Sequence, residues 1–426
     1  MSEIRNILPT LIFKLAETFP PFRSIVADRL GSDPNLTSKS MEDSVFLDFF
    51  RNLPRHPKHA LVFVIDALDE CGNAQNRPVL LKVLTEATSY APWLKIIVAS
   101  RPEDEIQEFF NRLPRLSHSR YDLSTDQEAG ADLITFARSQ FDLVAKTWRL
   151  STPWPEQSLF DEVISQANGL FIFVKTLILT LEQCDEDPEE TLKTALRDSA
   201  GTGLKPLYNL YSSILKARRV PRNPEFRQVI GVLLAAASHR TLCEESVAEL
   251  TGVRLNLVKK WVDDLSSLLY RDEAANGGIR VRHLSISDFF VSDQCAYQVN
   301  LEDTNMQLGI ACLKTMVKQL RFNICKLEDS RVANADIHDL PSRIKEHISD
   351  ALQYSSLYWS NHLCFTHDNG DRYVWGMLKE FFGGLNGLFW VEVLSIMGMV
   401  PIGAPTLRRV ITWAKVSSAL YFHLRK

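Results

Sequence analysis

Three acidic residues follow an apolar run in an order that can serve a magnesium site at the end of a strand. Asp66 ends the run 61–65, and Asp69 and Glu70 come one turn later. A carboxylate held at the carboxyl end of a buried strand can bind Mg²⁺, usually through water. Acids one turn further on can orient or deprotonate an attacking water. This is the Walker B arrangement, and its alternative is an apolar strand followed by a solvated acidic loop.

A second apolar run ends in an arginine that could read a phosphate. The run 95–99 is followed by Ser100 and Arg101. If both runs are parallel strands of one sheet, Arg101 lies at the same edge as Asp66, where such folds place a sensor for the terminal phosphate of a nucleotide. The guanidinium fork can pair with two phosphate oxygens. The alternative for Arg101 is a surface ion pair with Glu103 or Asp104.

The elements around these residues predict a βαβ unit. The two runs are rich in β-branched residues and continuously apolar, as strands buried on both faces are. Residues 79–87 repeat at helical spacing between them, and Pro78 suits a first helical turn. Further helices are predicted over 4–15, ended by Pro20-Pro21, and over 41–53, with a loop over 31–40.

After Tyr121 the strand signal disappears and helical spacing dominates. A short strand over 279–282 follows the turn Asn276-Gly277-Gly278, so three helices and a β-wing predict a winged-helix-like module. The predicted helices span 126–144, 157–167, 170–181, 204–216, 225–237, 244–250 and 255–269, and residues 301–426 are helical again. The expected fold class is therefore α/β followed by all-α: a partial P-loop NTPase parallel sheet in 1–122, a helical domain in 123–220, the winged helix in 221–300 and a C-terminal helical segment in 301–426.

Composition excludes several classes of protein. The chain has 426 residues and a net charge of −4, so no global charge favours nucleic acid or an anionic membrane. Its seven cysteines include no CxxC, which favours reduced thiols in a cytoplasmic protein, and no secretory signal peptide opens the chain. The apolar stretches 169–181 and 383–401 contain Lys175 and Glu392, so we expect buried core helices there, not membrane spans.

Two further groupings of residues carry weaker signals. The helices at 244–250 and 255–269 suggest a helix-turn-helix, but the acids Asp263 and Asp264 nearly cancel its basic residues. His362, Cys364 and His367 approximate a metal site without a fourth ligand. We therefore expect no specific nucleic-acid binding, and an ordinary helix through His362.

The residues around both strand ends resemble a known family. The segments Val64–Cys71 and Ile97–Glu103 are similar to the NACHT domain of fungal signalling NTPases of the STAND class, the NACHT/WD-repeat type. Further similar segments occur along the chain, at 169–173, 207–211, 282–290, 358–363 and 389–394. The resemblance covers nearly the whole chain, and its most specific part is 61–103.

The resemblance implies a nucleotide-dependent signalling switch that uses Mg²⁺ with ATP and ADP, or GTP. In this family ADP holds the domains closed, and exchange for ATP opens them for oligomerisation. Asp66 would then serve Mg²⁺, Glu70 with Asp69 would position water, and Arg101 would sense the γ-phosphate. His283 would contact the ADP β-phosphate from the winged helix. On the residues alone, His283 is better interpreted as a satisfied histidine at a strand end.

The sequence departs from the family at the phosphate cradle. A P-loop needs the motif GxxxxGK[ST]. None of the 18 glycines in the chain precedes a lysine, and residues 1–60 contain a single glycine, Gly31. We expect the chain to begin downstream of that loop, and to be unable to bind ATP by itself. It is then either a truncated or mis-started reading frame, or a degenerate paralogue that works without nucleotide. The expected function is a fragment of the switch with protein partners and possible homo-oligomers, and the alternative is a non-catalytic interaction or scaffold protein.

Overall fold

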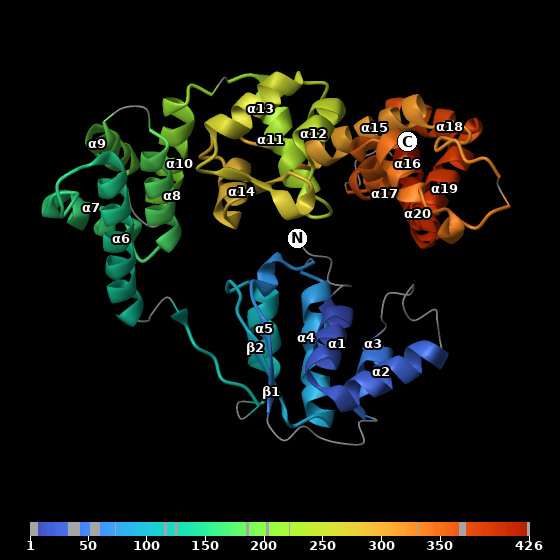
Figure 1. The fold of residues 1–426 in the computed structure, drawn as a ribbon, viewed down its shortest axis with the longest axis horizontal. Helices are drawn as coiled ribbons and strands as arrows, with labels where there is room; N and C mark the ends of the chain where they lie inside the picture. Colours follow the sequence, from blue (N-terminus) through green and yellow to red (C-terminus); the bar gives the residue numbers. More distant parts are fainter. Residues whose placement is uncertain are drawn as a thin grey trace. The chain divides into compact units, whose positions relative to one another are not determined.

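The computed structural model divides the chain into two compact units, Met1–Tyr121 and Asp122–Lys426. Both are mostly helical, and each contains one small sheet (Figure 1). The residues that the structure describes are 7–32, 43–51, 60–72, 74–114, 117–123, 127–184, 187–201, 204–220, 222–329, 331–365 and 372–423.

In its described residues, the first unit has five α-helices and a two-stranded sheet. Pro20-Pro21 ends one helix, as predicted, but it also begins the next, because proline fits a first helical turn. Most of the loop predicted over 31–40 lies outside the described residues. The helices are α1 Ile7–Thr18, α2 Pro20–Ser32, α3 Asp43–Arg51, α4 Asn76–Tyr90 and α5 Asp104–Arg112.

The predicted βαβ unit is confirmed. Strand β1, Leu61–Ile65, pairs in parallel with β2, Leu94–Val98, and α4 lies between them in sequence. The expectation that both faces of this sheet are buried is wrong for the described part of the chain. Val62, Val64 and Ile97 are 50%, 66% and 56% exposed. The opposite face carries Phe63 and Ile65, which are buried in the core of the unit together with apolar residues of α4.

The second unit begins with five helices that enclose an apolar core. Four of them match the predicted helices within a few residues. The fifth, α9, was missed because the acidic run from Asp185 indicated a loop. In the structure Asp187 caps this helix by accepting from the Glu189 backbone N–H, and Pro188 occupies the first turn. The helices are α6 Gln127–Trp148, α7 Gln157–Ala167, α8 Phe171–Glu182, α9 Pro188–Ser199 and α10 Lys205–Ala217.

Next come three helices, an antiparallel hairpin and a short fourth helix. The predicted helix 255–269 ends early, at Asp264; residues 265–268 form a turn, and Leu269 begins strand β3. The turn between the strands contains Asn276 and Gly277, both at positive φ, which suits these two residue types. The elements are α11 Pro224–Ala236, α12 Glu244–Thr251, α13 Leu255–Asp264, β3 Leu269–Asp272, β4 Gly278–Val281 and α14 Leu284–Val291.

The remaining chain is helical, as predicted. Helix α15 packs closely against α17, and the apolar core continues from the wing module into these helices without interruption. Among the described residues, no helix is long and apolar enough to cross a membrane. The helices are α15 Leu301–Gln319, α16 Leu340–His347, α17 Asp350–Leu363, α18 Arg372–Gly383, α19 Asn386–Ile396 and α20 Gly403–His423.

Candidate functional site

Parallel pairing brings the two predicted site segments to one edge of the first sheet. The ladder continues past the strand ends, because Ala99 N–H donates to the Ile65 carbonyl at 2.9 Å. Leu68 N–H then donates to the Ala99 carbonyl at 3.0 Å. The acidic turn after β1 is thus bonded directly to the segment that carries Arg101.

Asp66 is the exposed carboxylate at the end of β1. Its Oδ1 accepts from the Ala67 backbone N–H at 2.9 Å. Ala67 adopts left-handed backbone angles, with φ at 52°, and starts the 3₁₀ turn Leu68–Glu70. This conformation is uncommon for a residue with a side chain. It turns the chain sharply, so that Asp66 and Asp69 face different surroundings.

Asp69 is buried and holds the end of β2. Its Oδ1 accepts from the Arg101 backbone N–H at 3.0 Å and from the Ser100 hydroxyl at 3.3 Å. Its Oδ2 lies 3.6 Å from Nε of Arg101, whose side chain is about two-fifths exposed. Glu70, the next residue, is exposed. Of the two acids assigned to catalysis, Glu70 therefore faces solvent while Asp69 fixes the arginine segment.

Sequence reasoning missed Arg77, which organises the same turn. Its buried guanidinium donates to the Asp69 carbonyl at 2.6 Å, to the Cys71 carbonyl at 2.9 Å and to the Glu105 carboxylate at 2.5 Å. Arg77 therefore ties the turn after β1 to helix α5. Its position beside Pro78, in the first turn of a predicted helix, gave no signal of these distant partners.

Glu105 is the acidic partner of this buried arginine. A hydrogen bond from its own backbone N–H lowers the pKa of Glu105, and its bonds to Arg77 lower the pKa further. The carboxylate therefore stays ionised opposite the guanidinium. This pair stabilises the edge where the predicted site lies.

The carboxylates at this edge form no complete metal site by themselves. Across the described ranges, no three His, Cys, Asp or Glu side chains gather closely enough to hold a metal ion. Mg²⁺ in nucleotide sites uses one or two carboxylates together with phosphate oxygens and water. Asp66, an exposed carboxylate at a strand end, is compatible with a Mg²⁺ site that phosphate oxygens and water complete.

His283 lies in the second unit, apart from the other predicted residues in the chain. It caps α14, because its Nδ1 accepts from the Ser285 backbone N–H at 3.2 Å. The Ser285 hydroxyl lies 2.7 Å from the same nitrogen and 2.8 Å from the Tyr211 hydroxyl of α10. Ser285 and Tyr211 lay in segments similar to the family, but no spacing in the sequence connected them to each other.

The weaker metal grouping has another explanation. His362 is buried in α17, as expected, and both of its ring nitrogens have partners. Nε2 lies 2.6 Å from the Tyr354 hydroxyl, and Nδ1 lies 2.7 Å from Oδ1 of Asn305. Cys364 follows the helix, and His367 lies outside the described residues.

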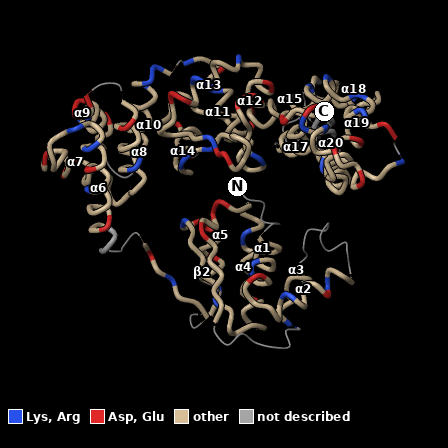
Figure 2. The backbone as a smooth tube through the Cα atoms, viewed as in Figure 1, with Lys and Arg blue, Asp and Glu red and all other residues tan. Residues whose placement is uncertain are grey.

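Basic residues of the helix-turn-helix candidate are paired with acids. Lys260 lies 2.6 Å from Asp264, and Lys259 lies 3.1 Å from Glu245. Positions of Lys and Arg are interspersed with positions of Asp and Glu along the backbone of both units (Figure 2). The pairing removes much of the positive charge that a phosphate backbone would meet.

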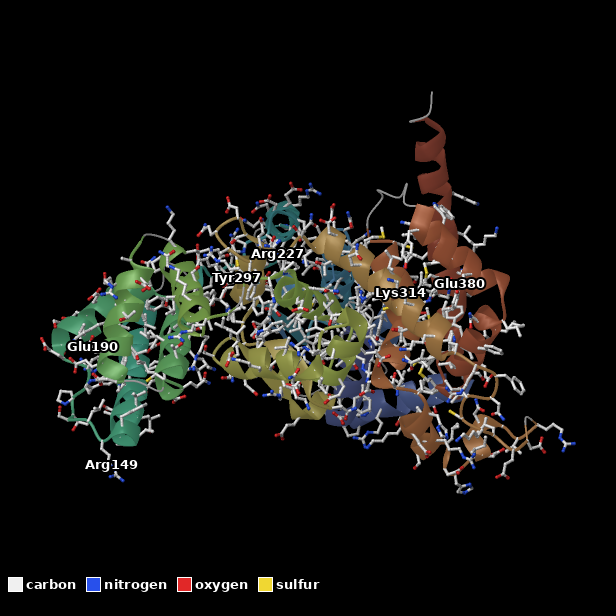
Figure 3. All side chains as sticks on the ribbon, turned by 90° about the horizontal axis from the view of Figure 1, so that it is seen from above. Arg149, Glu190, Arg227, Tyr297, Lys314 and Glu380 are labelled. Carbon is white, nitrogen blue, oxygen red and sulfur yellow. The ribbon has the colours of Figure 1, made fainter. Side chains whose placement is uncertain are left out.

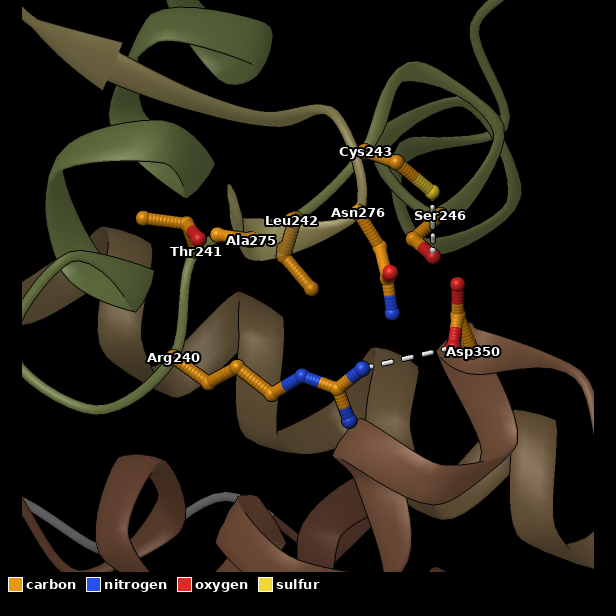
Figure 4. Close-up of a pocket in the computed structure, with 8 residues that line it drawn as sticks. All are labelled: Arg240, Thr241, Leu242, Cys243, Ser246, Ala275, Asn276 and Asp350. Atoms are coloured by element: carbon orange, nitrogen blue, oxygen red, sulfur yellow. Dashed lines mark hydrogen bonds and ion pairs between the residues drawn. The ribbon is translucent and has the colours of Figure 1, made fainter. Parts of the chain in front are cut away.

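Among the described residues of the second unit, two pockets stand out, and neither is lined by a predicted site residue. The first has a volume of about 10 Å³, enough for one water, and its lining includes Arg240 and Asp350, which form an ion pair of 3.3 Å (Figure 4). The second is a groove of about 320 Å³ between α12 and α15, with Lys314 on its wall (Figure 3).

Comparison with known proteins gives one partial match. The family model described as "Nephrocystin 3, N-terminal" matches residues 1–101. The matched segment contains α1 to α4, both strands and Arg101. No curated protein and no solved structure matches the chain. The similarity therefore concerns the first unit, and it covers too little of the chain to place the whole protein in a family.

Proposed function

We propose that this chain is part of a nucleotide-dependent signalling switch of the NACHT class. In this proposal the first unit supplies the magnesium and water edge of a P-loop NTPase sheet. The observation that carries the proposal is the direct bonding of the Asp66–Glu70 turn to the segment of Arg101 across the parallel ladder. The partial match over residues 1–101 supports it, because that match spans both strand ends.

Each residue has a distinct role in this proposal. Asp66 would hold Mg²⁺ through water, and the metal would complete its coordination with phosphate oxygens. Glu70 would orient the attacking water, since it is the exposed acid one turn further on. Asp69 would act indirectly, by holding Arg101 where its guanidinium can meet the γ-phosphate.

We further propose that this 426-residue chain does not bind a nucleotide by itself. In P-loop proteins, backbone N–H groups and one lysine hold the phosphates, and no GxxxxGK[ST] occurs in this sequence. Mg²⁺ held by Asp66 alone would lack the phosphate ligands that normally anchor it.

Calorimetric titration with Mg²⁺–ATP and Mg²⁺–GTP tests this proposal. We expect no binding tighter than about 10 μM, which corresponds to roughly −7 kcal/mol. A chain extended at its N-terminus by a strand and a GxxxxGK[ST] loop should bind, and Asp66→Ala should then remove the Mg²⁺-dependent part. Tight ATP binding by the unextended chain would contradict the missing cradle. Failure of the extended chain would contradict the nucleotide role.

A second candidate function is a non-catalytic interaction or scaffold protein. The exposed apolar face of the first sheet favours it, since Val62, Val64 and Ile97 face solvent where parallel sheets are usually covered. Under this alternative, Asp66→Ala and Glu70→Gln leave the cellular function unchanged, whereas Val64→Asp abolishes it.

A further inference from the structure

The groove between α12 and α15 is lined along one side by a single face of α15. The α15 residues of the lining follow helical spacing, at positions 307, 310, 311, 314, 315 and 318. At 1.5 Å of rise per residue, this face extends for about 16 Å. The lining also includes two buried apolar residues, Ile310 of α15 and Leu250 of α12. The groove is therefore an elongated surface with apolar residues at its base.

Two lysines on this face have no acidic partner within the described chain. Lys314 (Figure 3) and Lys318 are exposed, and neither forms an ion pair with a described residue. The Lys314 ammonium lies 5.3 Å from the centre of the Tyr373 ring, which attracts it without neutralising its charge. Glu249, the acid among the described lining residues, accepts a hydrogen bond from Gln319. The α15 wall therefore presents two positive charges that the described residues leave uncompensated.

A hydroxyl between the two lysines also lacks a partner. Thr315 lines the groove and is only 7% exposed, and its hydroxyl has no hydrogen-bond partner among the described residues. Helical threonines often donate to the carbonyl four residues earlier, as Thr180 does to Thr176 at 2.8 Å. Because an unmade hydrogen bond in a nearly buried side chain costs free energy, an acceptor that a ligand places in the groove would be favoured here.

The opposite wall favours carboxylates over phosphates as the anionic groups of a ligand. Helix α12 ends at Gly252, whose φ of 74° suits glycine at a helix C-terminus. The C-terminal end of a helix carries a partial negative charge, which opposes a dianionic phosphate more than a single carboxylate. Glu249 lies on the same wall. The backbone N–H groups of a peptide suit this wall, whereas acidic side chains suit the lysines.

The spacing along α15 matches alternate residues of an extended peptide. Ile310, Lys314 and Lys318 follow one another at four-residue intervals, which is about 6 Å of helical rise. Side chains on one face of an extended chain are about 6.6 Å apart, because they alternate from one face to the other. An apolar residue over Ile310 therefore brings acids at the next two alternate positions to the two lysines.

We propose that this groove binds an extended acidic segment of a partner protein, in which an apolar residue and two acids stand at alternate positions. The acids pair with Lys314 and Lys318, the apolar residue covers Ile310, and the Thr315 hydroxyl donates to an oxygen of the segment. The inference goes beyond the proposed function and does not depend on it, because none of these residues belongs to the edge of the first sheet.

Fluorescence anisotropy with a labelled peptide tests the groove in the whole chain. The probe is rhodamine-labelled Glu-Ser-Glu-Ser-Leu-Ser-Glu-Ser-Glu, which has the proposed spacing in both chain directions. We expect saturable binding with a dissociation constant below about 1 mM. The same peptide with glutamine in place of each glutamate should bind about tenfold more weakly, because one exposed ion pair contributes a factor of up to about five.

Variants of the chain separate the groove from the general effect of charge. Lys314→Gln combined with Lys318→Gln should weaken binding of the acidic probe about tenfold. Lys345→Gln combined with Lys379→Gln removes two exposed lysines outside the groove and should leave the affinity unchanged. Thr315→Val should weaken binding about fivefold, the size of one ordinary hydrogen bond. It should not lower the free energy of unfolding, since the hydroxyl has no partner within the described chain.

Several results would overturn the inference. One is the absence of saturable binding by the acidic probe, or an equal loss of binding in the two pairs of lysine variants. Another is displacement of the probe by inorganic phosphate but not by chloride at matched ionic strength, which would assign the groove to phosphate groups. A dimer, seen by analytical ultracentrifugation, that dissociates when Lys314 and Lys318 are replaced would make a second copy the occupant. The glutamine peptide gives an answer on the unmodified chain even if a variant does not fold.

Discussion

Asp66 and Asp69 differ in surroundings although only three positions separate them. A buried carboxylate must be hydrogen-bonded or paired, because leaving water is otherwise costly. Asp69 meets this need with the backbone N–H, the guanidinium of Arg101 and the Ser100 hydroxyl. Asp66 remains exposed. The left-handed turn at Ala67 accompanies the difference, so that Asp69 holds the Arg101 segment and Asp66 faces solvent.

The buried Arg77 yields the first prediction. Arg77→Met should lower the free energy of unfolding of the first unit by about 3 kcal/mol, because it leaves Glu105 and two carbonyls without their donor. Arg77→Lys should recover part of this loss, since one ammonium cannot span all three partners. Urea unfolding and hydrogen exchange of residues 61–72 measure the change.

Arg112→Met is the matched control for Arg77. Its ion pair with Glu108 is well exposed on both sides, so we expect less than about 0.5 kcal/mol. Equal effects of the two substitutions would contradict the role of Arg77 in holding the edge.

The second prediction concerns the buried histidine of α17. Burial lowers the pKa of His362 to about 3, and burial also lowers the pKa of His239, whose ring lies edge-on to it, to about 4. The unfolded chain therefore binds protons below about pH 6.5 that the folded chain excludes. The contribution of the two neutral histidines to the stability of the folded chain is complete above that pH and is lost progressively as the pH falls.

Each histidine should contribute a slope of about 1.4 kcal/mol per pH unit to unfolding below about pH 6.5. Between about pH 6 and pH 5, unfolded carboxylates still bind few protons, so the slope there reports mainly on the histidines. Urea unfolding over this range measures the slope, and His362→Gln should reduce it by about half. A flat wild-type profile there would contradict the neutral pair.

At the scale of elements, the first sheet shows why apolar runs are ambiguous. A continuous run such as 61–65 indicates burial on both faces, since each face of a parallel sheet usually carries a layer of helices. The described helices bury only the face of Phe63 and Ile65, so Val62 and Val64 are exposed. The sequence pattern indicates that the strand is suited to burial on both faces. Which face is buried depends on the helices that pack against the sheet.

Helix α15 depends on one close backbone contact, and this gives the third prediction. A Cβ on Gly309 would lie 2.7 Å from the backbone N of Leu363 in α17. Since backbone atoms cannot move aside as a flexible side chain can, Gly309→Ala should destabilise the second unit by about 1–3 kcal/mol. Thermal or urea unfolding measures the loss.

Gly376→Ala in α18 is the control for this helix contact. A Cβ at this position meets nothing within 4 Å. Because alanine favours a helix over glycine, we expect stabilisation of about 0.4–1 kcal/mol. A stabilising Gly309→Ala would contradict the close packing of α15 on α17.

At the scale of the whole molecule, charge predicts only weak contact with DNA. The net charge is −4, and the lysines of α13 are already paired with acids. We expect binding that is independent of sequence, with dissociation constants of about 10⁻⁴–10⁻⁶ M or weaker at physiological salt. A gel shift that finds sub-micromolar preference for one sequence would contradict this.

The sequence by itself determined most elements and the shared edge at which the two strands end. Apolar spacing located β1, α7 and α10 because local periodicity reflects which side of an element is buried. It also placed Asp66 and Arg101 after two strands, and parallel pairing then required a shared edge. The sequence analysis missed α9, because the acidic residues at its start are also typical of a loop. It missed β3, because the first residue of that strand was included in the predicted helix 255–269.

Only the tertiary structure decided which side chains meet. The three partners of Arg77 lie on two segments, the turn after β1 and helix α5, and Tyr211 meets Ser285 across 74 positions of chain. The exposure of Val64 and the burial of Asp69 likewise depend on neighbours that no local pattern specifies. Helix and strand propensities act over a few residues, whereas hydrogen bonds between distant segments form only when the packed core brings them together.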